Sequence, residues 1–201
     1  MKISELFTKY KSDKNHGNTV NIYNNLDDRV VVPDADPKIG HTYGPVYDEM
    51  FSEYPTDSEI SILEVGAQKG GSILAYRDYF PNASLYGVDI IDCILPEFRR
   101  DDINYIFNDV KSDQALEEIN KNTYDVIIDD GSHFLPDVMY VVVNFLKLLK
   151  PNGTMLIEDC QQPEAWVHHI KSVVPRGYSL EVRDLREGNG YDNFIILIKK
   201  V

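Results

Sequence analysis

From residue 60 onward, short apolar runs alternate with longer segments of helical periodicity. The runs are rich in β-branched side chains and predict strands at residues 60–65, 84–89, 104–107, 125–129 and 154–158. Several are almost continuously apolar, which is typical of parallel strands with helices on both faces. The intervening segments predict helices at residues 71–80, 112–120, 135–149 and 163–174.

The helix expected at 135–149 has the clearest apolar stripe. Its apolar positions share one side of the helix and belong to the core: Val138, Val141, Val142, Phe145, Leu148 and Leu149. The strand–helix alternation predicts an α/β fold, a Rossmann-like doubly wound sheet with right-handed crossovers. The tail differs, because residues 178–185 and 194–200 predict two strands with no room for a helix between them. We therefore expect a mostly parallel sheet that ends in a C-terminal antiparallel β-hairpin.

Residues 1–59 follow another pattern. Helices are expected at 3–10 and 47–53, whereas residues 15–40 are rich in Asn, Asp, Pro and Gly and show little periodicity. A long unpatterned segment of this kind is usually either functional or disordered. We therefore expect an N-terminal segment, 1–59, with an Asn-rich insertion that covers the C-terminal edge of the sheet as a lid, and a domain at 60–201.

Charge and composition narrow the function classes. The chain of 201 residues has 20 Lys plus Arg against 33 Asp plus Glu, a net charge of -13. Nucleic-acid binding relies on Lys and Arg, so a small-molecule partner is expected instead. No apolar stretch has signal-peptide or membrane-spanning length, so a cytoplasmic location without membrane contact is the expectation. Cys93 and Cys160 show no metal-ligand spacing and are expected to be reduced thiols.

The turn after the first strand of the domain contains Gly66, Gly70 and Gly71. Glycines there let the backbone approach a ligand and leave N–H groups free at the helix start. The spacing is not the dinucleotide GxGxxG. Asp89, at the end of the second strand, is placed to accept hydrogen bonds from both ribose hydroxyls. Asn108 and Asp109 follow the third strand, where an adenine edge would lie.

Two acidic pairs end the fourth and fifth strands, Asp129–Asp130 and Glu158–Asp159. Neighbouring strands lie about 4.8 Å apart, so Asp130, Glu158 and Asp159 should converge. Their mutual repulsion requires a proton or a cation. Oxygen ligands with room for water favour Mg²⁺, Mn²⁺ or Ca²⁺ over zinc.

His133 lies on the turn that follows Asp130. A neutral imidazole with a pKa near about 6.5 suits proton abstraction at neutral pH. His168 and His169 are expected to be solvated on a helix, and His16 and His41, which flank the insertion, are left without a role.

With these motifs the chain resembles class I S-adenosylmethionine-dependent methyltransferases. The resemblance covers roughly residues 60–200 and rests on these segments: 62–71 (ILEVGAQKGG), 87–89 (GVD), 124–130 (YDVIIDD) and 150–159 (KPNGTMLIED). The run DGSH at 130–133, followed by Glu158 and Asp159, is similar to the metal-dependent sugar O-methyltransferases of the macrocin and mycinamicin type and to the related cephalosporin hydroxylase and rhamnosyl O-methyltransferase proteins.

That resemblance implies a seven-stranded methyltransferase fold, S-adenosylmethionine as cofactor and Mg²⁺ or a similar ion. Asp130, Glu158 and Asp159 would be the metal ligands, and His133 the general base with Asp130 beside it in the catalytic pair. The implied cofactor site consists of Glu64, Gly66, Gly70, Ser72, Asp89, Asn108, Asp109 and Asp129. The implied substrate is a small sugar-containing molecule, and a homo-oligomer is compatible with the sequence.

Other functions use similar sheets. A nicotinamide-dependent oxidoreductase would require the tighter glycine spacing and has no need for the acidic pairs. A non-catalytic binding protein would not need His133 and the acids. A catechol or small phenol would replace the sugar as a chelating diol, and the sequence does not decide between these acceptors.

Overall fold

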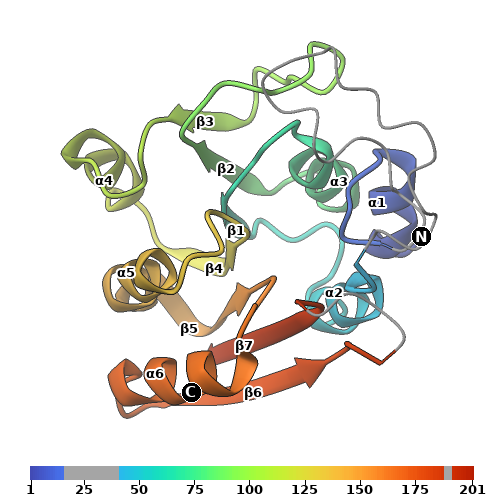
Figure 1. Cartoon of the computed structure of the whole chain (residues 1–201). Helices are drawn as coiled ribbons and strands as arrows, with labels where there is room; N and C mark the ends of the chain where they lie inside the picture. The colour runs from blue at the N-terminus through green and yellow to red at the C-terminus, as the bar shows by residue number, and fades with distance from the viewer. Residues whose placement is uncertain (16–40, 188–191) are drawn as a thin grey trace, which may run out of the picture.

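The computed structural model describes residues 1–15, 41–187 and 192–201. They form one sheet of seven strands in the order β3-β2-β1-β4-β5-β7-β6, with helices on both faces (Figure 1). The order reverses beside β1, which creates the crevice where α/β sheets of this type bind ligands.

The parallel part of the sheet runs from β3 to β5. Its strands are β1 (Ser61–Val65), β2 (Ser84–Asp89), β3 (Asn104–Phe107), β4 (Tyr124–Asp129) and β5 (Leu149–Ile157). Val65 pairs with both Val88 and Asp129, and Asp129 pairs with Ile157. The carboxyl ends of these strands are therefore level, and the loops that follow them lie at one edge.

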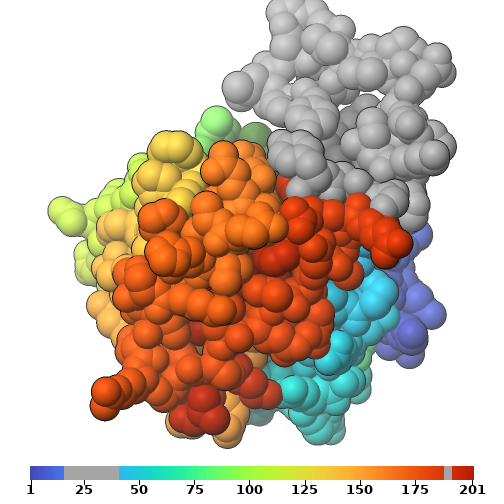
Figure 2. Space-filling model, turned by 60° about the horizontal axis from the view of Figure 1, so that its bottom comes forward, coloured from blue at the N-terminus to red at the C-terminus, as the bar shows by residue number. Residues whose placement is uncertain are grey.

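Two antiparallel strands complete the sheet, β6 (Tyr178–Asp184) and β7 (Phe194–Lys200). The last strand, β7, lies between β5 and β6 and is antiparallel to both. The predicted α/β class, with a mostly parallel sheet and an antiparallel C-terminal pair, is confirmed. Figure 2 shows the outer side of this region, where α6 and β6 form a continuous surface beside α2.

In the part of the chain that the structure describes, three helices pack on each face of the sheet (Figure 1). One core contains α1 (Ile3–Lys9), α2 (Gly44–Phe51) and α3 (Gly71–Tyr79). The other contains α4 (Asp113–Ile119), α5 (Leu135–Phe145) and α6 (Pro163–Val173). Sheet residues alternate between the two cores, since side chains along a strand point to opposite faces.

The end of α5 differs from the prediction. The apolar stripe continues to Leu149, but the helix ends at Phe145, a 3₁₀ turn spans Leu146–Leu148, and Leu149 already pairs with Tyr124 as the start of β5. Pro151 disfavours a helical conformation at the residue before it. The apolar side chains are buried as predicted, but the last of them belong to the connection and the strand.

The N-terminal helices pack against the sheet domain and share its core. Phe7, Tyr47 and Phe51 surround Tyr76 of α3, with ring centroids between 5.7 and 6.3 Å from its own. Such aromatic contacts add to the free energy gained from burial. Most of the Asn-rich segment expected to act as a lid lies outside the described residues. No helix in the described ranges is long and apolar enough to cross a membrane.

Candidate active site

A cavity of about 1050 Å³ opens at the carboxyl ends of the parallel strands. Its walls come from the loops after β1, β2, β3, β4 and β5 and from two N-terminal stretches, residues 10–13 and His41. The cavity therefore lies at the point where the strand order reverses, as expected for this topology.

The glycines of the turn after β1 allow three segments of the backbone to approach one another closely. A Cβ on Gly66, whose φ is +92°, would lie 1.8 Å from the carbonyl oxygen of Asp130. A Cβ on Gly71 would lie 2.7 Å from the carbonyl oxygen of Tyr10. Gly66 thus lets the loop after β1 touch the loop after β4, and Gly71 lets the N-terminal segment close against α3.

Asp89 lies at the cavity wall, at the end of β2. Its Oδ2 accepts a hydrogen bond of 2.7 Å from the Gln68 N–H, and its Oδ1 accepts one of 3.3 Å from the Ile91 N–H. These bonds fix the carboxylate, and each oxygen keeps a lone pair for a ligand. The arrangement suits a vicinal diol such as that of a ribose.

Most of the residues expected to bind the cofactor line the cavity. They are Gly66, Ser72, Asp89, Asn108, Asp109 and Asp129. Glu64 and Gly70 are not among the described residues that line it. Glu64 is fully buried, where it accepts hydrogen bonds from Ser72 (2.7 Å) and Tyr76 (3.1 Å). Burial raises the pKa of Glu64 to about 7, against the opposing effect of Lys14.

Asp129 lines the cavity and is only 4% exposed. Within the described residues its Oδ2 has no hydrogen-bond partner. Burial raises the pKa of Asp129 to about 7, although His133 acts in the opposite direction. A buried carboxylate oxygen without a hydrogen-bond partner is costly, so a ligand that donates a hydrogen bond to Oδ2 or carries positive charge would be stabilised here.

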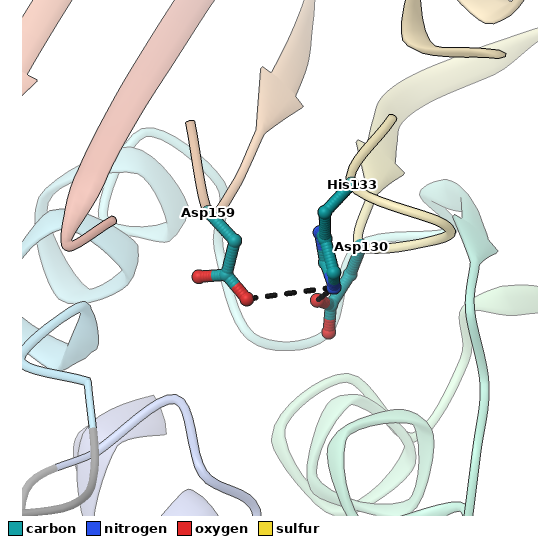
Figure 3. A group of neighbouring side chains, drawn as sticks. All are labelled: Asp130, His133 and Asp159. Atoms are coloured by element: carbon teal, nitrogen blue, oxygen red, sulfur yellow. Dashed lines mark ion pairs between the residues drawn. The ribbon is translucent and has the colours of Figure 1, made fainter. Parts of the chain in front are cut away.

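Asp130, His133 and Asp159 lie together on the same wall of the cavity (Figure 3). His133 Nε2 lies 3.5 Å from Asp159 Oδ2 and 3.9 Å from Asp130 Oδ1. One ligand atom from each residue falls within 4.8 Å of the others. The two strand-end loops thus converge as the sequence predicts, and the group is compact enough to surround a metal ion.

Two of these residues have unusual backbone conformations. His133 has a φ of +51° and Asp159 a φ of +53°. Left-handed conformations are uncommon for residues other than glycine and often occur at functional sites. The conformation turns both side chains toward one point.

Asp159 is held by two N-terminal side chains. Tyr43 donates a hydrogen bond from its hydroxyl to Asp159 Oδ1, and His41 Nε2 lies 3.4 Å from the same oxygen. Burial and the neighbouring Asp159 carboxylate raise the pKa of Tyr43 far above its ordinary value, so the hydroxyl stays protonated and donates. Oδ2 remains the oxygen that faces His133.

Glu158 is buried beside this group and shares the ammonium group of Lys14 with Asp130. Its Oε1 accepts a hydrogen bond of 2.6 Å from the Tyr47 hydroxyl, and its Oε2 forms an ion pair with the ammonium group of Lys14. Lys14 also reaches Asp130 Oδ2 at 2.5 Å and Glu64 Oε1 at 3.5 Å. Of the predicted metal ligands, Asp130 and Asp159 therefore face His133, whereas Glu158 meets Asp130 at the ammonium group of Lys14, and its role as a metal ligand stays a prediction.

Lys14 changes the electrostatics expected from the sequence. Burial alone would lower the pKa of Lys14, but Asp130 and Glu158 outweigh it and hold that pKa well above its usual value. Burial would raise the pKa of Asp130, whereas Lys14 and then His133 hold it below its usual value. Part of the negative charge that seemed to require an external cation is thus balanced by the protein itself.

Sequence reasoning missed the N-terminal contributors to the site, Lys14, Tyr43 and Tyr47, and assigned no role to His41. Their contacts span more than 100 positions of the chain. The local sequence offers one sign that these residues have a role: a polar segment that contains both a lysine and a histidine lies beside a short helix. This sign does not specify which residues they contact.

The chain is similar to several known proteins. The chain is 31% identical over 135 residues to mycinamicin VI 2''-O-methyltransferase of Micromonospora griseorubida, covering 61% of this chain and 33% of that protein. It is also 31% identical over 134 residues to demethylmacrocin O-methyltransferase of Streptomyces fradiae, with the same coverage. The chain therefore spans about a third of the length of these relatives. No family model matches it.

A solved structure is similar over the whole chain. It is a methyltransferase of the mycinamycin biosynthetic pathway in complex with Mg, SAH and mycinamycin VI, with a TM-score of 0.70 and 20% identity, covering 100% of this chain and 53% of the other. A second structure, the O-methyltransferase TomG of Streptomyces achromogenes in complex with SAM, gives a TM-score of 0.57 at 14% identity, covering 73% and 74%. The chain has the class I methyltransferase fold, and the two sequence relatives described above are named as O-methyltransferases.

Proposed function

We propose that the chain is an S-adenosylmethionine-dependent, divalent-metal-assisted O-methyltransferase that acts on a hydroxyl group of a sugar or glycoside. The observation that carries this proposal is the position of the Asp130–His133–Asp159 group in the same cavity as Asp89 and Asp129. A nucleoside-type site and a group suited to activating a hydroxyl thus share one space. The sequence relatives support the same activity.

The cavity fits S-adenosylmethionine at two carboxylates. Asp89 would accept hydrogen bonds from the ribose hydroxyls, and Asp129 would bind the ammonium group of the methionine part through its unpartnered Oδ2. S-Adenosylmethionine, when bound, supplies a methyl group on a sulfonium centre. The protein then has to hold the acceptor oxygen in line with that methyl group and exclude water.

The donor set also fits a divalent cation. Asp130 and Asp159 would bind the ion through Oδ1 and Oδ2, the oxygens that face His133. Mg²⁺ is often held by one or two carboxylates and completed by water and substrate oxygens. Such an ion lowers the pKa of a hydroxyl group near it. An acceptor with neighbouring hydroxyls would be selected over one with an isolated hydroxyl.

His133 would serve as the general base. Hard cations such as Mg²⁺ prefer oxygen to imidazole nitrogen, so His133 is left free to accept a proton. Its Nε2 lies next to both proposed ligands, where an acceptor hydroxyl would lie. General-base catalysis of this kind typically contributes about 10²–10⁴-fold in rate.

A screen for release of S-adenosylhomocysteine tests this function. The purified protein would be incubated with S-adenosylmethionine and Mg²⁺ and offered glycosides, nucleotide sugars or catechols. We expect turnover with a sugar-containing diol and its loss after treatment with EDTA. Turnover with catechols alone would show that the acceptor is a phenol and not a sugar. Turnover that EDTA does not affect would contradict the role of the metal.

Replacing Asp129 with Asn should weaken cofactor binding. The amide keeps the shape of the side chain but loses the negative charge opposite the proposed ammonium group, and hydrogen bonds to charged groups contribute about 1.5–3 kcal/mol. We expect the Kd for S-adenosylhomocysteine, measured by calorimetry, to rise at least about tenfold. The matched control is Glu97→Gln, which removes a charge from an exposed part of the cavity wall. Equal affinities of the Asp129→Asn variant and the parent protein would exclude this contact.

A further inference from the structure

The cavity has a second end that the proposed nucleoside contacts do not reach. Those contacts lie after β2 and β3, on one side of β1. On the far side of β4 the wall is formed by the residues that follow β5, by a residue that precedes β7 and by the N-terminal segment: Asp159, Gln161, Asp192 and His41. The volume of about 1050 Å³ is large for a single ligand, since sites for one small molecule measure about 300–1000 Å³.

A buried asparagine builds the wall at this second end. Asn193 is fully buried, and its Oδ1 accepts a hydrogen bond of 3.4 Å from the Thr42 N–H. Its Nδ2 donates to Thr42 Oγ1 and to the carbonyl oxygen of Leu185, both at 2.9 Å. A buried polar network whose members are satisfied makes the surrounding backbone rigid. His41 and Asp192 directly adjoin these residues, so both are held on one fixed frame.

His41 and Asp192 offer polar atoms to the cavity. The imidazole of His41 stacks on the Tyr43 ring, with centroids 4.6 Å apart and planes 13° from parallel, and its Nε2 lies 3.4 Å from Asp159 Oδ1. Among the described residues, neither His41 Nδ1 nor the Asp192 carboxylate takes part in a hydrogen bond or ion pair. An imidazole can donate or accept a hydrogen bond, and a carboxylate accepts several, so these groups suit a ligand rich in hydroxyl groups.

We propose that His41 and Asp192 bind the sugar of the acceptor, and that this end of the cavity takes an uncharged sugar in preference to one that carries a carboxylate. Asp192 would accept hydrogen bonds from hydroxyl groups that are not methylated, and His41 would hold the sugar next to Asp159. An anionic sugar would bring like charge to the unpaired Asp192 carboxylate, which weakens binding. This inference rests on the proposed function and names the class of sugar on which it would act.

Binding of methyl glycosides to the protein loaded with S-adenosylhomocysteine and Mg²⁺ tests this inference. The probes are the methyl glycosides of glucose, galactose and mannose, each compared with the methyl glycoside of its uronic acid, and saturation-transfer difference NMR measures the Kd. We expect at least one neutral glycoside to bind and its uronic acid to bind at least about tenfold more weakly. Equal or tighter binding of the uronic acid would overturn the inference.

Two variants test the residues themselves. Asp192→Asn keeps the size of the side chain and removes its charge, so the Kd for the neutral glycoside should rise at least about fivefold and its advantage over the uronic acid should shrink as much. His41→Phe keeps the ring that stacks on Tyr43 and removes both nitrogens, and we expect a similar rise. In both variants the Kd values for S-adenosylhomocysteine and Mn²⁺ should stay within about twofold of the parent values. The matched control is Asp137→Asn, a cavity carboxylate paired with Lys111, which should leave glycoside binding unchanged.

The outcomes separate this inference from the proposed function. A protein that binds S-adenosylhomocysteine but none of the glycosides, or variants that bind them as tightly as the parent, would overturn the sugar site and leave the methyltransferase proposal standing. Weaker Mn²⁺ binding by His41→Phe would show that His41 orients Asp159 and does not contact the sugar. A parent protein that does not bind S-adenosylhomocysteine would overturn the proposed function itself.

Discussion

His133→Ala is expected to lower the turnover number by about 10²–10⁴-fold, the usual contribution of a general base. The imidazole faces Asp130 and Asp159 at 3.9 and 3.5 Å, where a hydroxyl bound between them would need to lose its proton. Because the proposed ion is bound by carboxylates, the affinities for Mn²⁺ and S-adenosylhomocysteine should stay within about twofold. Steady-state kinetics and calorimetry on the same preparation measure both effects.

The matched control is His168→Ala, which removes an exposed histidine from α6 and should leave all three quantities unchanged. A loss of Mn²⁺ affinity in the His133→Ala variant would identify His133 as a metal ligand and not as a base. Unchanged turnover would remove it from the chemistry.

Asp159→Asn is expected to weaken divalent-cation binding at least about tenfold and to lower activity at limiting Mg²⁺ in proportion. The substitution removes the charge of one proposed ligand, and carboxylate is the ligand type that Mg²⁺ prefers. The amide oxygen can still accept the hydrogen bond from Tyr43, so the fold should be preserved. Titration with Mn²⁺, followed by electron paramagnetic resonance, measures the change.

The control for this prediction is Asp137→Asn, because Asp137 also lines the cavity but is paired with Lys111 and Ser132. We expect its Mn²⁺ affinity to match that of the parent protein. Equal losses in both variants would point to a general effect of cavity charge, and no loss in the Asp159→Asn variant would exclude Asp159 from the metal site.

The fold follows largely from local patterns. Strand runs such as 84–89, 104–107 and 194–200 have the same bounds in the structure as in the prediction. The almost continuously apolar runs of β1 and β4 reflect burial on both faces, which requires no knowledge of distant residues. The end of α5 shows the limit of the method, because the apolar stripe is the same whether Leu146 to Leu149 form a helix or a turn and a strand.

The candidate site could be predicted only in part. The sheet order places the ends of β4 and β5 together, so Asp130, His133 and Asp159 meet as expected. The same expectation placed Glu158 beside Asp159. Successive side chains of a strand point to opposite faces, however. Glu158 continues this alternation past the end of β5, and its side chain is buried in the interior. The left-handed backbone of Asp159 directs its side chain toward the cavity.

The contacts of the N-terminal segment could not be inferred from periodicity. Lys14 meets Glu158 across 144 positions of the chain, and nothing in the spacing of either residue specifies the pair. The sequence indicates that a group of acids needs positive charge. It does not show that a lysine supplies part of that charge.

Paramagnetic relaxation of the S-adenosylmethionine methyl protons by Mn²⁺ measures most directly whether the ion and the methyl donor share the cavity. The account predicts strong enhancement when Mn²⁺ is added to the complex of protein and S-adenosylmethionine, and its loss in the Asp159→Asn variant. Binding of Mn²⁺ without any enhancement would place the ion far from the sulfonium group and would contradict the account.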